Sequence, residues 1–296
     1  MYQGILKIVS IASRGGKVPP LYLFISYILP GAIYFRYLTG TFKILPFFLI
    51  SISIIPLLAA TNLFDDYFDY KYGYDKEYSP NTRYRKHPIY YFGVSEGYLL
   101  IWGIISIAIY FIMFSIISRI YGIYELIIAI IGFILGYGYT GPPFGFKYKA
   151  LGEASVVLSA LLISLMVFYA ESGHFSMNVI IFAVPYSVIL VPVLFLGNYR
   201  DIHYDKSQGM KTLPIILGVE RSKYVPAAIF IIFYLLIILY CFKNIYPIMS
   251  VFSVITIPIS FYGVRKWMNL FDTQYENFMG NLIFLNTIVL SLFILL

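Results

Sequence analysis

The chain has 296 residues, of which 60% are hydrophobic and only 12% charged, with a formal net charge of +7 and a mean hydropathy of +0.81. Soluble domains carry about 25% charged residues, so this chain has too few polar groups to cover a water-exposed surface. The composition excludes an ordinary soluble domain and predicts a polytopic integral membrane protein, and a single cysteine, Cys241, excludes an internal disulfide.

Nine segments are apolar enough to be spanning helices, which need roughly 20 mostly apolar residues. In chain order they lie near residues 18–38, 43–63, 97–117, 123–140, 153–171, 177–197, 224–242, 245–262 and 279–296. The stretch before the first segment mixes charged and apolar residues, and we expect an interfacial amphipathic segment there rather than a cleavable signal. No long linker interrupts the chain, so we expect one all-α domain over residues 1–296.

The basic residues gather in every second connection between these segments. The even connections, which hold most of the 21 Lys and Arg residues, are 64–96, 141–152, 198–223 and 263–278. Because basic residues concentrate in cytoplasmic loops, we predict a multi-pass plasma-membrane protein with its N-terminus and even loops in the cytoplasm and its C-terminus outside. This bias accounts for the net charge, so we expect no nucleic-acid partner, and we infer no obligate protein partner.

Two acidic clusters follow the second and sixth apolar segments. The first reads "NLFDDYFDYKYGYD" from Asn62, and the second reads "NYRDIHYD" from Asn198. On a helix, each cluster would place an Asn and two Asp side chains on one face. Carboxylates gathered at a low-dielectric membrane edge are unfavourable unless a cation offsets their charge, and oxygen ligands suit Mg²⁺. The candidate metal ligands are Asn62, Asp65, Asp66, Asp69, Asn198, Asp201 and Asp205.

Two other interpretations of these clusters remain open from the residues alone. A single cluster could be a solvated polar collar at the membrane interface, although two matched clusters disfavour that reading. The carboxylates could also form the ion site of a cation-coupled transporter. Transporter sites usually lie near the bilayer midplane. These clusters lie at span ends among basic residues, which suits Mg²⁺ and a diphosphate better.

The two clusters resemble the Asp-rich motifs of the UbiA superfamily of intramembrane prenyltransferases, over residues 62–75 and 198–212. They look closest to the menaquinone-type branch, the 1,4-dihydroxy-2-naphthoate prenyltransferases. The stretch "YGYTGPPFGFKYKALGE", residues 137–153, is similar to a third shared stretch of that branch. Asp65 stands where the branch usually has Asn, so either Asn62 or Asp65 completes the metal set. The N-terminal Arg-Pro of the family is here "SRGGKVPP", which leaves Arg14 and Lys17 as alternatives.

The resemblance implies nine transmembrane helices around a central cavity, with cytoplasmic cap loops. It also implies Mg²⁺-dependent transfer of a polyprenyl group from an allylic polyprenyl diphosphate to an aromatic acceptor. The acceptor of the branch is 1,4-dihydroxy-2-naphthoate, in menaquinone biosynthesis; geranylgeranylglyceryl phosphate and 4-hydroxybenzoate are the alternatives. Carried over by motif, the catalytic candidates are Asp66, Asp69, Asp201, Asp205 and Tyr139, and the diphosphate-binding candidates are Lys71, Arg200, Lys211, Lys147, Arg14 and Lys17.

Two local expectations concern the loops. The Gly and Pro residues of "TGPPFG", residues 140–145, should interrupt the helical segment before them and bring Lys147 toward the site. His87 and His203 could assist acid–base steps, but we expect both to lie at the wet edge of the protein.

Overall fold

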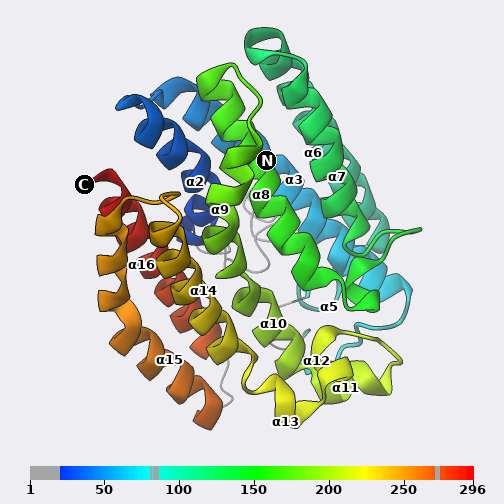
Figure 1. The fold of residues 1–296 in the computed structure, drawn as a ribbon. Helices are drawn as coiled ribbons and strands as arrows, with labels where there is room; N and C mark the ends of the chain where they lie inside the picture. Colours follow the sequence, from blue (N-terminus) through cyan, green and yellow to red (C-terminus); the bar gives the residue numbers. More distant parts are fainter. Residues whose placement is uncertain (1–20, 81, 83–86, 271–273) are drawn as a thin grey trace. The chain divides into compact units, whose positions relative to one another are not determined.

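Every regular element in the described part of the chain is helical. The computed structural model describes residues 21–80, 82, 87–270 and 274–296, and no strand occurs among them (Figure 1). Seven of the described helical segments are long and apolar enough to cross a membrane, judged by length and composition. They are Ile44–Lys71, Glu96–Tyr121, Gly152–Ser172, Met177–Arg200, Val219–Phe242, Ile248–Trp267 and Phe278–Leu295. The prediction of an all-α fold with several membrane spans is confirmed, and the number nine stays a prediction.

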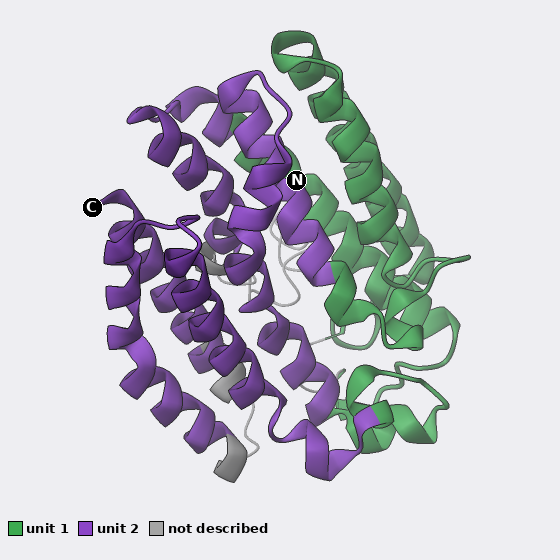
Figure 2. Ribbon diagram, viewed as in Figure 1, with its two compact units in different colours: residues 1–19, 49–155, 201–216 green, residues 20–48, 156–200, 217–296 purple. Residues whose placement is uncertain are grey.

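The chain divides into two compact units. The first contains residues 49–155 and 201–216, and the second contains residues 20–48, 156–200 and 217–296 (Figure 2). The acidic parts of both motifs, residues 62–75 and 201–205, fall in the first unit.

The first unit is built on three apolar helices, α3 (Ile44–Lys71), α6 (Glu96–Tyr121) and α7 (Tyr124–Gly138). The Phe64 ring packs edge-on against Tyr137 of α7, with centroids 5.5 Å apart. On α6 the absence of a side chain at Gly103 makes room for Phe64, since a Cβ there would lie 2.7 Å from that ring. Helix α3 continues past the predicted end at residue 63 to Lys71, so the first acidic cluster is helical, as predicted.

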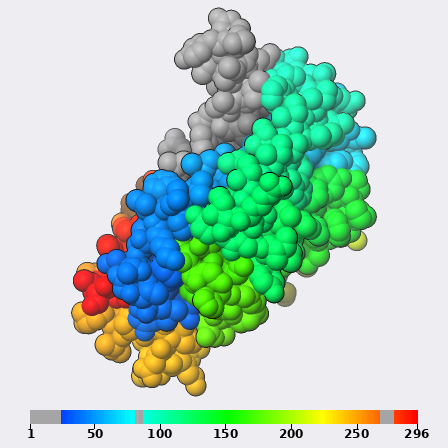
Figure 3. Space-filling view, turned by 90° about the horizontal axis from the view of Figure 1, so that it is seen from above, coloured from blue at the N-terminus to red at the C-terminus, as the bar shows by residue number. Residues whose placement is uncertain are grey.

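One flank of α6 is a stripe of exposed isoleucines. They are Ile101, Ile104, Ile109, Ile112, Ile116 and Ile120, and Figure 3 shows part of this helix in blue-green. Apolar side chains exposed along a helix of this length suit contact with lipid.

The other elements of the first unit are short or contribute only their first turns. They are α5 (Pro88–Phe92), η1 (Phe146–Lys149), the start of α8 (Gly152–Ser172), α11 (Ile202–Ser207) and the start of α12 (Leu213–Leu217). After α7 the chain turns back sharply: the Gly141 N–H donates to the Tyr137 carbonyl at 2.8 Å, and Gly145 has a φ of +57°. The Lys147 N–H then donates to the Tyr139 carbonyl at 2.9 Å, which confirms the predicted interruption.

The second unit is a helical bundle. Its elements are α2 (Leu21–Thr39), most of α8, α9 (Met177–Val188), α10 (Val191–Arg200), α13 (Val219–Ser222), α14 (Val225–Phe242), η2 (Ile248–Thr256), α15 (Ile257–Leu270) and α16 (Gln274–Leu295). Three buried hydroxyls and an amide join α14, η2, α15 and α16, because the Tyr234 hydroxyl lies 2.8–2.9 Å from Thr256, Ser260 and Asn286. The predicted span 177–197 is interrupted between α9 and α10.

Close packing of α2 on α8 gives a stability prediction. A Cβ added at Gly31 would lie 2.2 Å from the Ser164 carbonyl oxygen, a backbone atom that cannot move cheaply. We expect Gly31→Ala to destabilise the protein by roughly 1–3 kcal/mol, as overpacking does. Thermal unfolding in detergent measures the loss. Gly97→Ala is the matched control, because its Cβ would meet nothing closer than 3.9 Å, and equal melting temperatures for the two variants would contradict the packing argument.

Candidate functional site

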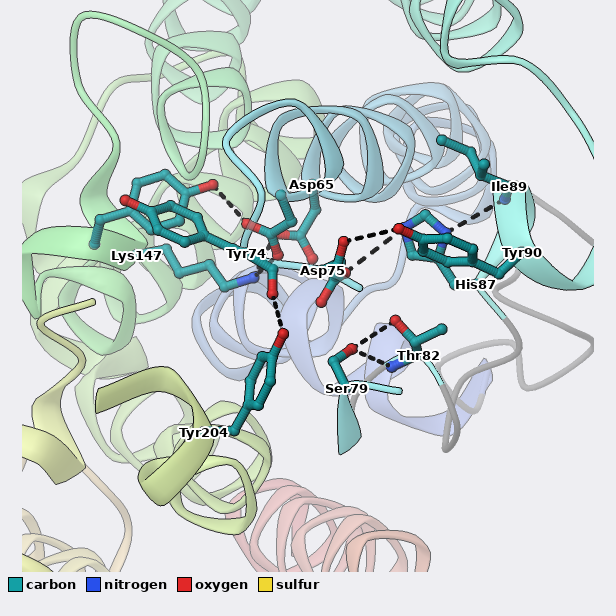
Figure 4. A network of polar contacts seen from close by, with 12 residues as sticks. Asp65, Tyr74, Asp75, Ser79, Thr82, His87, Ile89, Tyr90, Lys147 and Tyr204 are labelled. Atoms are coloured by element: carbon teal, nitrogen blue, oxygen red, sulfur yellow. Dashed lines mark hydrogen bonds and ion pairs between the residues drawn. The ribbon is translucent and has the colours of Figure 1, made fainter. Parts of the chain in front are cut away.

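The carboxylates of the first motif surround a lysine. Asp65, Asp66 and Asp69 are buried on the last turns of α3. The Lys147 ammonium donates to Asp65 Oδ1 at 2.9 Å and also to Asp69 Oδ2, and its side chain is only 11% exposed (Figure 4). The Tyr148 hydroxyl donates to the other oxygen of Asp69, Oδ1, at 2.6 Å. Adjacent residues of η1 therefore hold both oxygens of one carboxylate.

The neighbouring carboxylates keep Lys147 protonated. Burial lowers the pKa of Lys147, but the charges of Asp65 and Asp69 raise it by more, so the pKa lies well above the usual value. Burial and the Asp69 charge both raise the pKa of the Tyr148 hydroxyl, so it remains a neutral donor. Lys147 is therefore a buried cation at neutral pH, held by two carboxylates.

A second contact group lies on the loop that follows α3. His87 Nε2 is 3.6 Å from Asp75 Oδ2, and its Nδ1 accepts a hydrogen bond from the Ile89 N–H at 3.3 Å (Figure 4). A neutral imidazole that accepts at Nδ1 carries its proton on Nε2, so His87 presents an N–H to Asp75. One ligand atom from each of Asp66, Asp75 and His87 lies within 4.8 Å of the others. His87 is buried and caps the start of α5, so its predicted place at the solvent-exposed edge is wrong. His203 is exposed, as expected.

The second motif joins the first through α11. Asp201 and Asp205 are buried in the first unit, and the Tyr204 hydroxyl donates to the Tyr74 carbonyl at 3.0 Å (Figure 4). The pKa of Asp205 is raised to about 8, and burial is the largest cause. The charge of Lys147 lowers this pKa, whereas the charges of Asp201, Asp69 and Asp75 raise it. Because these charges act on Asp205, the acidic parts of the two motifs share one electrostatic environment. Asn198 and Arg200 precede them at the end of α10, in the second unit.

The remaining candidates differ in their exposure and in their contacts. The half-buried Tyr139 ring has the Lys147 Nζ 6.0 Å from its centroid. Lys71 is exposed and donates to the Tyr67 hydroxyl at 3.0 Å, and Lys211 is also exposed. Asn62 is half-buried, one turn before Asp66 on α3. Arg14 and Lys17 lie outside the described residues.

Three residues of the site were not singled out from the sequence: Asp75, Tyr148 and Tyr204. Asp75 belongs to the quoted first motif, and Tyr148 is next to Lys147, so position along the chain could have indicated both. Tyr204 likewise lies inside the quoted second motif, next to Asp205, but its residue type does not distinguish it among 30 tyrosines.

Comparison with protein families decides what kind of chain carries this arrangement. The model of the UbiA prenyltransferase family matches residues 24–288. The chain belongs to this family. The resemblance of the two Asp-rich motifs to UbiA proteins is thereby confirmed, and with the apolar helices it makes the chain a multi-pass membrane protein of UbiA type.

Individual UbiA relatives support the same assignment. The chain is 27% identical over 187 residues to the 1,4-dihydroxy-2-naphthoate octaprenyltransferase of Bacillus subtilis, a match that covers 63% of this chain and 59% of that protein. It is 29% identical over 203 residues to UbiA prenyltransferase domain-containing protein 1 of Dictyostelium discoideum, covering 66% of this chain and 59% of that protein. The matches thus span less than two thirds of these relatives' own lengths.

Solved structures share the UbiA fold. A UbiA homologue from Aeropyrum pernix K1 superposes with a TM-score of 0.69 at 16% identity, covering 92% of this chain and 96% of that one. A UbiA homologue from Archaeoglobus fulgidus, bound to GPP and Mg²⁺, superposes with a TM-score of 0.67 at 16% identity, covering 97% and 99%. At these identities the likeness concerns the fold.

Proposed function

We propose that this protein transfers a polyprenyl group from an allylic polyprenyl diphosphate to an aromatic acceptor, with Mg²⁺ bound by its two Asp-rich motifs. One observation carries the proposal: buried carboxylates of both motifs share one environment with a buried lysine. Membership of the UbiA family and the relative named for naphthoate prenylation support it.

The residues fit a hard divalent cation. Carboxylate oxygens are the ligands that Mg²⁺ takes together with substrate phosphates. Burial is the main cause that raises the pKa of Asp205, to about 8, and a bound cation would favour its ionised form. The residues that would hold the metal are Asp65, Asp66, Asp69, Asp201 and Asp205, and the asparagines of the two motifs, Asn62 and Asn198, are further candidates. Bound Mg²⁺ supplies charge neutralisation for the diphosphate as it leaves.

The chain's own cations and aromatic rings would take the other roles. Lys147 contacts the carboxylates and would bind diphosphate oxygens, with Arg200, Lys71 and Lys211 as further candidates. Preorganised cations of this kind stabilise the charge that develops on the leaving group. As the C–O bond breaks, positive charge grows on the prenyl carbon, and the Tyr139 ring would stabilise it through its face.

The acceptor we propose is 1,4-dihydroxy-2-naphthoate, whose electron-rich ring attacks the prenyl carbon and then loses its carboxyl group as CO₂. The Bacillus subtilis relative and the "YKYGYD" and "GYTGPP" stretches support this choice. Geranylgeranylglyceryl phosphate and 4-hydroxybenzoate are the alternatives.

We further propose one domain of nine spans around a cavity that admits the prenyl chain. The charge distribution supports a plasma-membrane location with the N-terminus and motif loops cytoplasmic and the C-terminus outside.

A panel of acceptors tests the acceptor assignment. Purified protein is incubated with geranylgeranyl diphosphate, Mg²⁺ and each of the three acceptors separately, and products are identified by mass spectrometry. We expect a prenylated, decarboxylated product from 1,4-dihydroxy-2-naphthoate. A product from geranylgeranylglyceryl phosphate or 4-hydroxybenzoate alone would refute the acceptor and leave the prenyl transfer standing.

A further inference from the structure

Lys147 contacts carboxylate oxygens that the proposed metal would need as ligands. Lys147 Nζ contacts one oxygen of Asp65 and one of Asp69, and the Tyr148 hydroxyl takes the second Asp69 oxygen. A cation approaching these carboxylates therefore meets a positive charge already in place. In a buried setting that repulsion is weakly screened.

Lys147 can move away from Asp65 and Asp69 only if its ammonium binds another anion. Its side chain is 11% exposed, and an ammonium left without a partner in such a place is strongly unfavourable. The lysine stem is flexible, with four carbons, so the ammonium can swing while the backbone of η1 stays in position. A diphosphate arriving beside the carboxylates would supply the new anionic partner.

We propose that Lys147 is an internal counter-ion that stands in the metal's place until a diphosphate draws it away. This inference rests on the proposed function and deepens it. The divalent cation replaces Lys147 at Asp65 and Asp69, and Lys147 moves to the phosphate oxygens, so each ion keeps an opposite charge beside it. Metal and diphosphate then bind cooperatively, and the reactive arrangement assembles only when the prenyl substrate is present.

Metal binding without turnover tests this coupling. Mn²⁺ serves as the probe, because carboxylate sites that suit Mg²⁺ also suit Mn²⁺ and its binding is measurable by electron paramagnetic resonance. The full chain in detergent is titrated with Mn²⁺, with and without inorganic diphosphate, at matched free Mn²⁺. Couplings between two ligands typically change affinity roughly 5- to 150-fold. We expect Lys147→Gln to bind Mn²⁺ alone about tenfold more tightly than the wild type, and to lose most of the enhancement by diphosphate.

The control is Lys149→Gln, which removes the same charge two residues away. Lys149 is exposed, and its ammonium donates to the Pro143 carbonyl at 3.3 Å, whereas the Lys147 ammonium donates to two aspartates. We expect Mn²⁺ affinity in this variant to match the wild type. Unchanged or weaker Mn²⁺ binding in Lys147→Gln would overturn the proposal. If Lys147→Gln does not fold, the wild-type protein still tests the proposal. Equal Mn²⁺ affinity of the wild type with and without diphosphate would overturn the proposal.

Two further variants separate this inference from the proposed function. Asp66→Ala and Asp201→Ala should lose Mn²⁺ binding. If both bind Mn²⁺ as the wild type does, the metal is not held by the motifs, and the proposed function fails together with the inference. If both lose binding while Lys147→Gln gains none, only the role of Lys147 is wrong.

Discussion

Asp66→Ala and Asp201→Ala should each abolish prenyl transfer while leaving the protein folded. Each removes a buried carboxylate from one of the two motifs. The metal they would hold contributes several kcal/mol of charge stabilisation, and each ~1.4 kcal/mol corresponds to a factor of ten in rate, so turnover should fall by roughly a thousandfold or more. Product formation under saturating prenyl diphosphate measures the loss, and elution of the variants by size exclusion and their thermal unfolding establish that they are folded.

Glu77→Ala is the matched control for these variants. Glu77 lies two residues after Asp75 on the same loop, but its side chain is exposed. Loss of a solvated carboxylate there should leave the rate close to that of the wild type. Near-normal turnover in Asp66→Ala or Asp201→Ala would show that the corresponding motif does not hold the metal.

Removing divalent cations should have an equally large effect. With the cation absent, Lys147 stays on Asp65 and Asp69 as their counter-charge, and that same lysine is then not available to the diphosphate. We expect excess EDTA to stop turnover completely and added Mg²⁺ to restore it, with Mn²⁺ also effective because it shares the preference for oxygen ligands.

Chelation also separates the enzyme from a transporter. Heat-inactivated protein treated with EDTA and then Mg²⁺ gives the background rate at which the prenyl diphosphate releases diphosphate. A cation-coupled transporter would release no diphosphate under any of these conditions. Turnover that persists in EDTA would refute the metal assignment for both motifs.

The sequence predicted the acidic site because its signals are local. Helical spacing placed Asp65 and Asp69 four residues apart on one face of α3, and both contact the Lys147 ammonium. Pro56 lies inside α3, but no Gly or Pro occurs in residues 57–71, which is why the helix extends through the motif to Lys71. The glycines and prolines of residues 140–145 likewise predicted the turn that brings Lys147 back to the carboxylates.

Contacts between distant segments were not predictable in the same way. Lys147 was one basic residue among several candidates, and only the turn through Gly145 and the neighbouring Asp65 single it out. His87 follows a polar, basic stretch that suggested exposure, yet it is buried because it caps α5 and pairs with Asp75 twelve residues earlier. Tyr148 and Tyr204 had no compositional signal, since tyrosine is abundant along the whole chain.

The most direct test of prenyl transfer follows both products of one reaction. Purified protein is incubated with geranylgeranyl diphosphate, 1,4-dihydroxy-2-naphthoate and Mg²⁺, and inorganic diphosphate and prenylated product are measured together over time. The account predicts that both appear at equal rates, that neither appears without the acceptor, and that the Asp66→Ala protein gives neither. Failure of the wild-type protein to release diphosphate with any acceptor, in the presence of Mg²⁺, would contradict it.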